Sequence, residues 1–307
     1  MFELLDSTLR LATPLIFAAM GGFFCERVGI ATICLEGVLL TSAWTAATVT
    51  YYSHHCYLGL LAAVLVGAAT LSIQSFLTVK AKADAIVSGV AVNLLAAGIT
   101  PMLSKFLFAS ATNTPAIPLA ERFQVVSLPL LSKIPFVGNL LFSQPLLVSF
   151  ALLLPFLIDY IAYRTGWGLR LLACGDSPEA LKTAGVSPAK VRYLSLALGG
   201  AIASFGGAYL STAHASQFTR EMTAGRGFIA LTALIFGKWR PLPAFVACLF
   251  FGFTDALQIQ LQSSPLLGNT FPIQALQIVP YLVTLFVLVG FIGGAKPPLS
   301  IGKVDFT

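Results

Sequence analysis

Apolar runs of about 20 residues alternate with short polar links along most of the chain. A helix of that length crosses a hydrocarbon core of about 30 Å. The run at 228–237 is about half as long, which predicts a broken or half-helix covered by protein or lining a polar cavity. We therefore expect eight to nine transmembrane helices, at about 7–24, 31–51, 57–79, 85–106, 144–163, 193–211, 228–237, 242–261 and 273–294.

The composition supports this fold class. The chain is 57% hydrophobic and 10% charged, with a mean hydropathy of +0.87, which excludes an ordinary soluble domain. The alternating pattern of a barrel is absent, so the spans must be helical. We predict an all-α polytopic membrane protein with one domain over residues 1–307 and a proline-containing external loop at about 107–143.

The basic residues predict an orientation. If the link at 164–192 lies in the cytoplasm, 12 of the 18 Lys and Arg residues lie inside and 6 outside. The positive-inside rule then gives an outside N-terminus and an inside C-terminus. The net charge of +6 indicates topology and contact with anionic membrane lipid, and we expect no nucleic-acid partner.

The link RTGWGLRLLACGDSPEALKTAGVSPAKVR, at 164–192, is unusually polar and rich in turn residues. Ser177 and Pro178 predict the start of a short helix, and Gly185 its end. Ser187 and Pro188 repeat the start signal and lead into the next span. A helix of about two turns is marginal alone, so either a partner protein docks on it or the link is a solvated loop with two caps.

A few polar residues interrupt the apolar runs. Glu36, Asn93 and Asp255 lie within predicted spans, and Gln258 and Gln262 follow Asp255 on one helical stripe. A central acid costs about 2.5–3.5 kcal/mol on the insertion scale, so such groups tend to face a cavity. The candidate translocation path is thus Glu36, Asn93, Asp255 and Gln258, and the alternative is hydrogen bonding between helices.

Catalytic chemistry is poorly represented. The chain lacks HExxH, GxSxG and P-loop motifs, and the adjacent His54 and His55 suit a solvated outer loop better than a metal site. The five cysteines include no CxxC pair. We expect no catalytic, cofactor or metal residues, and any ATP that drives the protein must bind another subunit.

Three blocks resemble a known family: ERVGIATICLEGVLL at 26–40, GWGLRLLACGDSPEALKTAGVS at 166–187 and GRGFIALTALIFGKWRPLPAFVACLFFG at 225–252, with AIVSGVAVNLLAAGIT at 85–100 as a weaker fourth. They are similar to permease subunits of bacterial ABC importers of the branched-chain amino acid and simple sugar class, most closely its nucleoside-uptake branch. Thr32 departs from the asparagine of the family pattern.

The resemblance implies a multi-pass subunit of the bacterial cytoplasmic (inner) membrane that moves nucleosides by alternating access. It implies ABC ATPase partners that carry ATP and Mg, a second permease chain (hetero- or homodimer) and an extracytoplasmic substrate-binding lipoprotein. The ATPase-coupling residues would be Gly175, Asp176, Ser177, Pro178, Glu179, Ala180, Leu181, Ala184 and Gly185. Alternatives are a permease for sugars or branched-chain amino acids, a secondary transporter or channel, and an intramembrane enzyme, which the missing catalytic groups disfavour.

Overall fold

The computed structural model describes residues 2–123, 144–263 and 297–302. Helices dominate these residues, and an isolated antiparallel bridge pairs Asn113 with Thr219. The helices in chain order are α1 (Phe2–Arg27), α2 (Leu35–Ser53), α3 (Cys56–Ser75), α4 (Ala85–Phe108), α6 (Leu146–Arg164), α7 (Gly166–Asp176), α8 (Pro178–Thr183), α9 (Pro188–Tyr209), α10 (Arg226–Phe236) and α11 (Pro241–Ser263). The predicted all-helical class is confirmed for the described part of the chain.

Within the described residues, six helical segments are long and apolar enough to cross a membrane: Glu3–Arg27, Cys56–Lys80, Ala85–Phe108, Leu146–Arg164, Pro188–His214 and Pro241–Gln262. Two of them include a π-helical end, Phe76–Lys80 after α3 and Leu210–His214 after α9. Helix α2 is not in this set, although it has 19 residues. The expected span at 273–294 lies outside the described residues, so the structure does not confirm eight to nine crossings.

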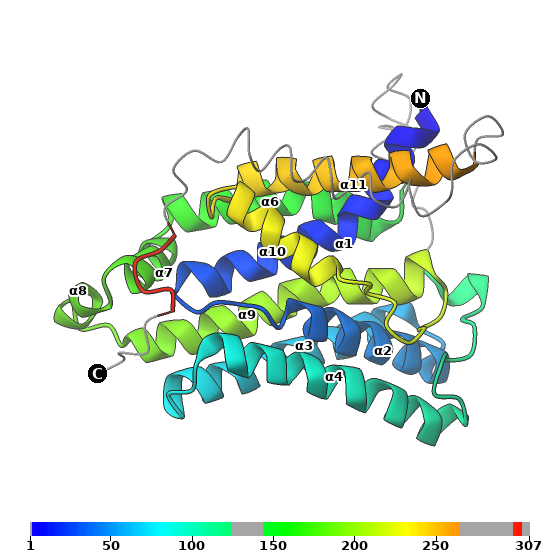
Figure 1. The fold of residues 1–307 in the computed structure, drawn as a ribbon, viewed down its shortest axis with the longest axis horizontal. Helices are drawn as coiled ribbons and strands as arrows, with labels where there is room; N and C mark the ends of the chain where they lie inside the picture. The colour runs from blue at the N-terminus through cyan, green and yellow to red at the C-terminus, as the bar shows by residue number, and fades with distance from the viewer. Residues whose placement is uncertain (1, 124–143, 264–296, 303–307) are drawn as a thin grey trace.

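The helices form a bundle elongated along their axes, with α1 and α9 side by side at its centre (Figure 1). Helix α1 also packs against α11 and α10, and α9 packs against α3 and α2. Helix α4 lies at the edge, on α2 and α3. Short α8 lies beyond one end of the bundle, and the first turn of α1 lies toward the other (Figure 1).

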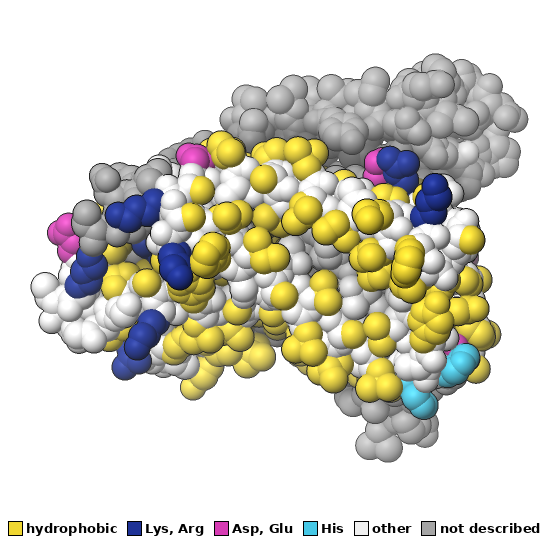
Figure 2. All heavy atoms as spheres, turned by 90° about the horizontal axis from the view of Figure 1, so that it is seen from below, with side chains coloured by type: hydrophobic (Ala, Val, Ile, Leu, Met, Phe, Trp, Pro, Cys, Tyr) yellow, Lys and Arg dark blue, Asp and Glu magenta, His cyan; other side chains and the backbone are white. Residues whose placement is uncertain are grey.

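The outer surface matches a bundle immersed in lipid. Figure 2 shows mostly hydrophobic side chains over the middle of the face that it presents, with Lys and Arg gathered toward the two ends. Helix α4 has several exposed apolar residues, among them Val87, Leu94 and Met102. An apolar surface of this extent is unfavourable in water but favourable in the hydrocarbon core of a membrane.

Local sequence explains where several helices start. Proline occupies the first turn of α8, α9 and α11, where its missing N–H costs nothing. The Asp84 carboxylate caps α4 by accepting hydrogen bonds from the N–H groups of Ile86 and Val87 at 2.8 and 3.0 Å.

Glycines let the central helices approach closely. A Cβ added to Gly21 of α1 would lie 2.4 Å from the carbonyl oxygen of Gly199 in α9. A Cβ added to Gly200 would lie 2.2 Å from the carbonyl oxygen of Gly67 in α3. Glycine thus permits close helix packing at Gly21 and Gly200.

Two segments differ from the sequence-based expectation. Residues 166–176, predicted as polar link, form helix α7, because Leu171 and Cys174 recur on one face and are buried. Residues 28–34, whose second half was predicted to begin a span, are not helical, and α2 starts only at Leu35.

Candidate functional site

The segment α7–α8 is the first candidate. Helix α8 spans Pro178–Thr183, as the cap residues predict, and Gly185 has the left-handed φ of +78° that ends it. The Ser177 hydroxyl, however, makes no capping hydrogen bond, which corrects that detail. The Gly185 and Val186 N–H groups instead bond back to the carbonyls of Lys182 and Leu181 at 2.9 and 3.1 Å.

The coupling candidates divide into buried and exposed residues. Leu181 is only 5% exposed and belongs to the central hydrophobic core, so it cannot reach a partner from this position. Gly175 is also buried. Pro178 is half-buried, and the remaining candidates are exposed: Asp176, Ser177, Glu179, Ala180, Ala184 and Gly185. Any docking face of α8 must therefore use exposed positions such as Ala180 and Ala184, whereas Leu181, which the resemblance implies as a coupling residue, is turned into the core.

The second candidate is the non-helical segment at residues 28–34, which is buried or half-buried throughout. Its backbone is bonded by side chains from four helices. Arg192 Nε donates to the Val28 carbonyl at 3.2 Å, and Gln74 Nε2 to that of Ala31 at 3.2 Å. Glu26 Oε1 accepts from the Thr32 N–H at 3.1 Å. Irregular backbone inside a membrane protein needs such partners, because no water is present to replace them.

Asn93 of α4 belongs to this arrangement. Its Nδ2 donates to the Ile33 carbonyl at 3.0 Å, and its Oδ1 accepts from the Gly37 N–H at 2.8 Å. The amide thus bonds the last part of the irregular segment and the first turn of α2. Both functional ends of the Asn93 side chain are engaged within the chain.

Glu36 joins α2 to the half-helix α10. Its Oε1 accepts from the Gly225 N–H at 2.8 Å, and its Oε2 accepts from the Gly227 N–H at 2.7 Å. Gly225 has a left-handed φ of +80°. A Cβ on Gly227 would lie 2.4 Å from the backbone nitrogen of Glu36. The carboxylate satisfies orphan donors at the positive end of α10, so its charge and the helix dipole are complementary.

We call residues 28–34, Glu36 and the start of α10 the junction. Glu36, Asn93 and the short α10 were predicted from the sequence, whereas Glu26, Gln74 and Arg192 were not. All three are buried in the structure. Glu26 also accepts a hydrogen bond from Trp239 Nε1, which links α1 to the turn after α10. The signal that could have found them is the one that marked Glu36, a polar side chain inside or at the edge of an apolar run.

Asp255 and Gln258 lie apart from the junction's hydrogen bonds. Both are half-buried on α11, whose helical geometry confirms the stripe with Gln262. Asp255 lies close enough to Arg226, the first residue of α10, for their charges to interact. Of the four path candidates, Glu36 and Asn93 therefore bond at the junction, whereas Asp255 and Gln258 do not. Asp255 instead lies near Arg226 at the start of α10.

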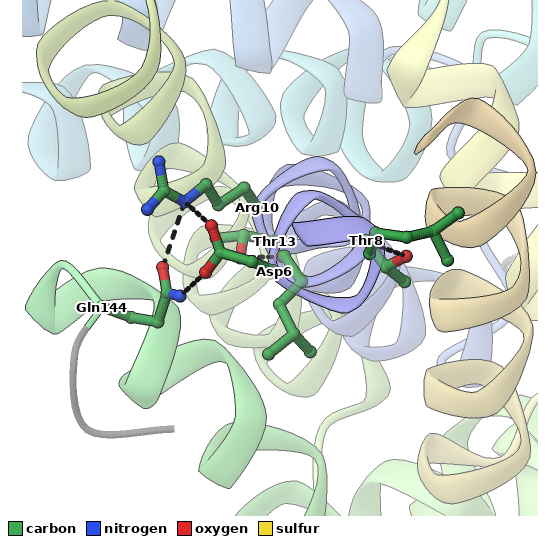
Figure 3. A network of polar contacts seen from close by, with 7 residues as sticks. Asp6, Thr8, Arg10, Thr13 and Gln144 are labelled. Carbon is green, nitrogen blue, oxygen red and sulfur yellow. Dashed lines mark hydrogen bonds and ion pairs between the residues drawn. The ribbon is translucent and has the colours of Figure 1, made fainter. Parts of the chain in front are cut away.

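A further polar network lies at the end of the bundle remote from α8. Figure 3 shows Asp6, Arg10 and Gln144 pointing toward one another between α1 and the start of α6. Arg10 Nε lies 3.1 Å from Asp6 Oδ2 and 3.2 Å from Gln144 Oε1, and Gln144 Nε2 donates to Asp6 Oδ1. This network fixes where the two helices meet at that end.

At the same end, His54 Nδ1 lies 2.8 Å from Glu121 Oε1, which ties the α2–α3 turn to the described part of the external loop. Three or more His, Cys, Asp or Glu side chains do not gather as a metal-binding group anywhere in the described ranges. The five cysteines are buried free thiols.

Comparison with known proteins agrees with these features. The family described as branched-chain amino acid transport system / permease component matches residues 4–288. The guanosine ABC transporter permease protein NupQ of Bacillus subtilis is 37% identical over 306 residues, covering 97% of this chain and 95% of NupQ. The nucleoside ABC transporter permease protein NupC of Lactococcus lactis is 35% identical, covering 95% of this chain and 92% of NupC.

A third relative, TsgC13 of Haloferax volcanii, is 33% identical over 93% of this chain and 90% of its own length. Its name describes it, provisionally, as a glucose ABC transporter permease protein. No solved structure matches significantly. The matches and the apolar helices place the chain in the class of multi-pass ABC transporter permeases. It belongs, more particularly, to the branched-chain amino acid transport system / permease component family.

Proposed function

We propose that this chain is the transmembrane subunit of an ATP-driven importer that carries nucleosides across the bacterial cytoplasmic membrane. The observation that carries the proposal is the full-length similarity to two permeases named for guanosine and nucleoside transport. The sugar alternative has the support of the relative from Haloferax volcanii, at a lower identity of 33%.

In this proposal the α8 end of the bundle faces the cytoplasm, and α8 docks in an ABC ATPase. Two ATPase subunits, which hold ATP and Mg, would work with this chain and a second permease, and a substrate-binding lipoprotein would deliver the nucleoside outside. The exposed, small Ala180 and Ala184 suit close docking, while the buried Leu181 holds α8 against the core of this chain.

The junction supplies a physical basis for alternating access. The Glu36 side chain of α2 holds the start of half-helix α10, so a movement of α10 when the ATPases close would be passed to α2. Glu36 and Asn93 then position helices around the route. Asp255 and Gln258, whose side chains the junction does not use, are better placed to meet the nucleoside directly.

Reconstitution tests the proposal. The chain is purified with the ATPase and permease that accompany it, placed in liposomes with ATP in the lumen that the ATPases face, and supplied with its binding protein. We expect ATP-dependent uptake of radiolabelled guanosine or another nucleoside, and stimulation of ATP hydrolysis by the loaded binding protein.

The same vesicles supplied with glucose or leucine provide the substrate control. Uptake of one of these in place of nucleosides would replace the proposed substrate. Uptake by this chain without any ATPase would instead indicate a secondary transporter or channel.

A further inference from the structure

The described tail of the chain, residues 297–302, lies against the end of α7 just before α8. The Ser300 N–H and hydroxyl both donate to the Gly175 carbonyl, at 3.0 and 2.6 Å. Ser300 is 7% exposed, and Pro298 is also buried. Gly175 lies in the last turn of α7, where a helix supplies no amide donor for its carbonyls. The tail therefore completes the C-terminal end of α7.

The same residues pack against the end of α1 without spare space. A Cβ on Gly175 would lie 2.0 Å from the Arg27 carbonyl oxygen and 3.4 Å from the Cβ of Pro298. A Cβ on Gly29, whose φ is +89°, would lie 1.9 Å from Ser300 Oγ. We call Gly29, Gly175, Pro298 and Ser300 the tail contact. The end of α1, the end of α7 and the tail, which are distant in sequence, are in close contact there.

The tail contact adjoins the junction. Gly29 lies one residue after Val28, whose carbonyl accepts from Arg192 of α9 at 3.2 Å, and three residues before Thr32, whose N–H donates to Glu26 at 3.1 Å. The end of α7 is thereby joined both to the tail and to the irregular segment that leads to Glu36. Hydrogen bonds and close backbone packing resist small displacements, so these segments move together.

We propose that the tail is a positioning element that fixes the α7–α8 segment to the end of α1, with Ser300 as the residue that does so. Movement imposed on α8 is then carried into residues 28–34 instead of being absorbed by the α7–α8 turn. This inference rests on the proposed function, because it assigns the tail a part in coupling ATP hydrolysis to the junction.

The test breaks the tail contact in two independent ways. Ser300→Ala removes the hydroxyl bond, and Gly29→Ala places a methyl group where the Ser300 hydroxyl lies. Ser187→Ala is the matched control, because Ser187 is an exposed serine in the link between α8 and α9 whose hydroxyl makes no capping bond. Each change is made in a chain that keeps Cys174 as its only cysteine, since Cys174 is fully buried beside Gly175 and reports loosening by its reaction with a maleimide.

We expect Cys174 labelling to be about three- to tenfold faster in both variants than in the parent, the range that loss of one net hydrogen bond implies. In the intact complex, stimulation of ATP hydrolysis by the loaded binding protein should fall while the ATPase stays bound. The Ser187→Ala chain should match the parent in both measurements.

Unchanged labelling in both variants would overturn the proposal, and so would faster labelling with undiminished stimulation. If the parent complex itself shows no response to its binding protein, the proposed function fails, whereas the labelling rates, which need no ATP, still decide whether Ser300 fixes α7.

Discussion

At the scale of single residues, the direction in which a side chain points decides what it can do. Both oxygens of Glu36 are used at the start of α10. Leu181 is turned into the core, although it lies on the helix proposed to dock. In both cases the direction of the side chain depends on long-range packing, which a single sequence does not encode locally.

Glu36→Gln should weaken the junction. A glutamine offers one acceptor oxygen, and its amide group would face the second N–H, so one charge-assisted bond is lost at a cost of about 1.5–3 kcal/mol. We expect a lower thermal unfolding midpoint in detergent and slower uptake. Glu3→Gln, at an exposed acid in the first turn of α1, is the control and should change neither. Equal unfolding midpoints for Glu36→Gln and the parent would contradict the capping role.

Asp255→Leu should separate transport from folding. Arg226 keeps its hydrogen bonds to the Met222 and Thr223 carbonyls, so removing the half-buried acid should not destabilise the protein. Loss of a polar contact to the substrate, worth about 1 kcal/mol, should slow uptake about fivefold. Asp159→Leu, at a half-buried acid of α6, controls for the loss of charge. Normal uptake rates with Asp255→Leu would remove Asp255 from the path.

At the scale of elements, periodicity and caps predicted most helices but not the breaks between them. The long apolar runs and the proline-started α8 and α9 were predicted, as was the short α10. The irregular conformation of residues 31–34 was not, because Ile33 and Cys34 are as apolar as any helix interior. The conformation of the whole segment 28–34 depends on Gln74, Asn93 and Arg192, which lie far away in sequence. Helix α7 was missed for a related reason: a short amphipathic pattern rich in glycine resembles a loop.

Gly227→Ala tests whether α10 must contact α2 backbone to backbone. The new methyl group would lie 2.4 Å from the Glu36 nitrogen, so α10 must shift at a cost of about 1–3 kcal/mol. Uptake and the unfolding midpoint should both fall. Gly98→Ala in α4 is the matched control: its Cβ meets nothing within 4 Å, and the change should be neutral or stabilise by up to about 1 kcal/mol. Similar behaviour of the two variants would refute the close contact.

At the scale of the whole molecule, α8 and the tail share one end of the bundle, and the α2–α3 turn lies at the other (Figure 1). Cysteine labelling of intact cells in a cysteine-free background should therefore distinguish Asp176→Cys from His55→Cys, both exposed positions. We expect membrane-impermeant reagent to reach position 55 only from outside and position 176 only after lysis. Reaction at position 176 in sealed cells would reverse the orientation.

The central claim is that α8 docks on a partner ATPase through Ala180 and Ala184. Its most direct test is photo-cross-linking from a benzophenone amino acid placed at position 184 in the assembled transporter, with position 65, an exposed apolar site on α3, as the comparison. We predict an ATP-sensitive cross-link to the ATPase from position 184 and none from position 65. An intact, transporting complex that gives no ATPase cross-link from position 184 or position 180 would contradict the claim.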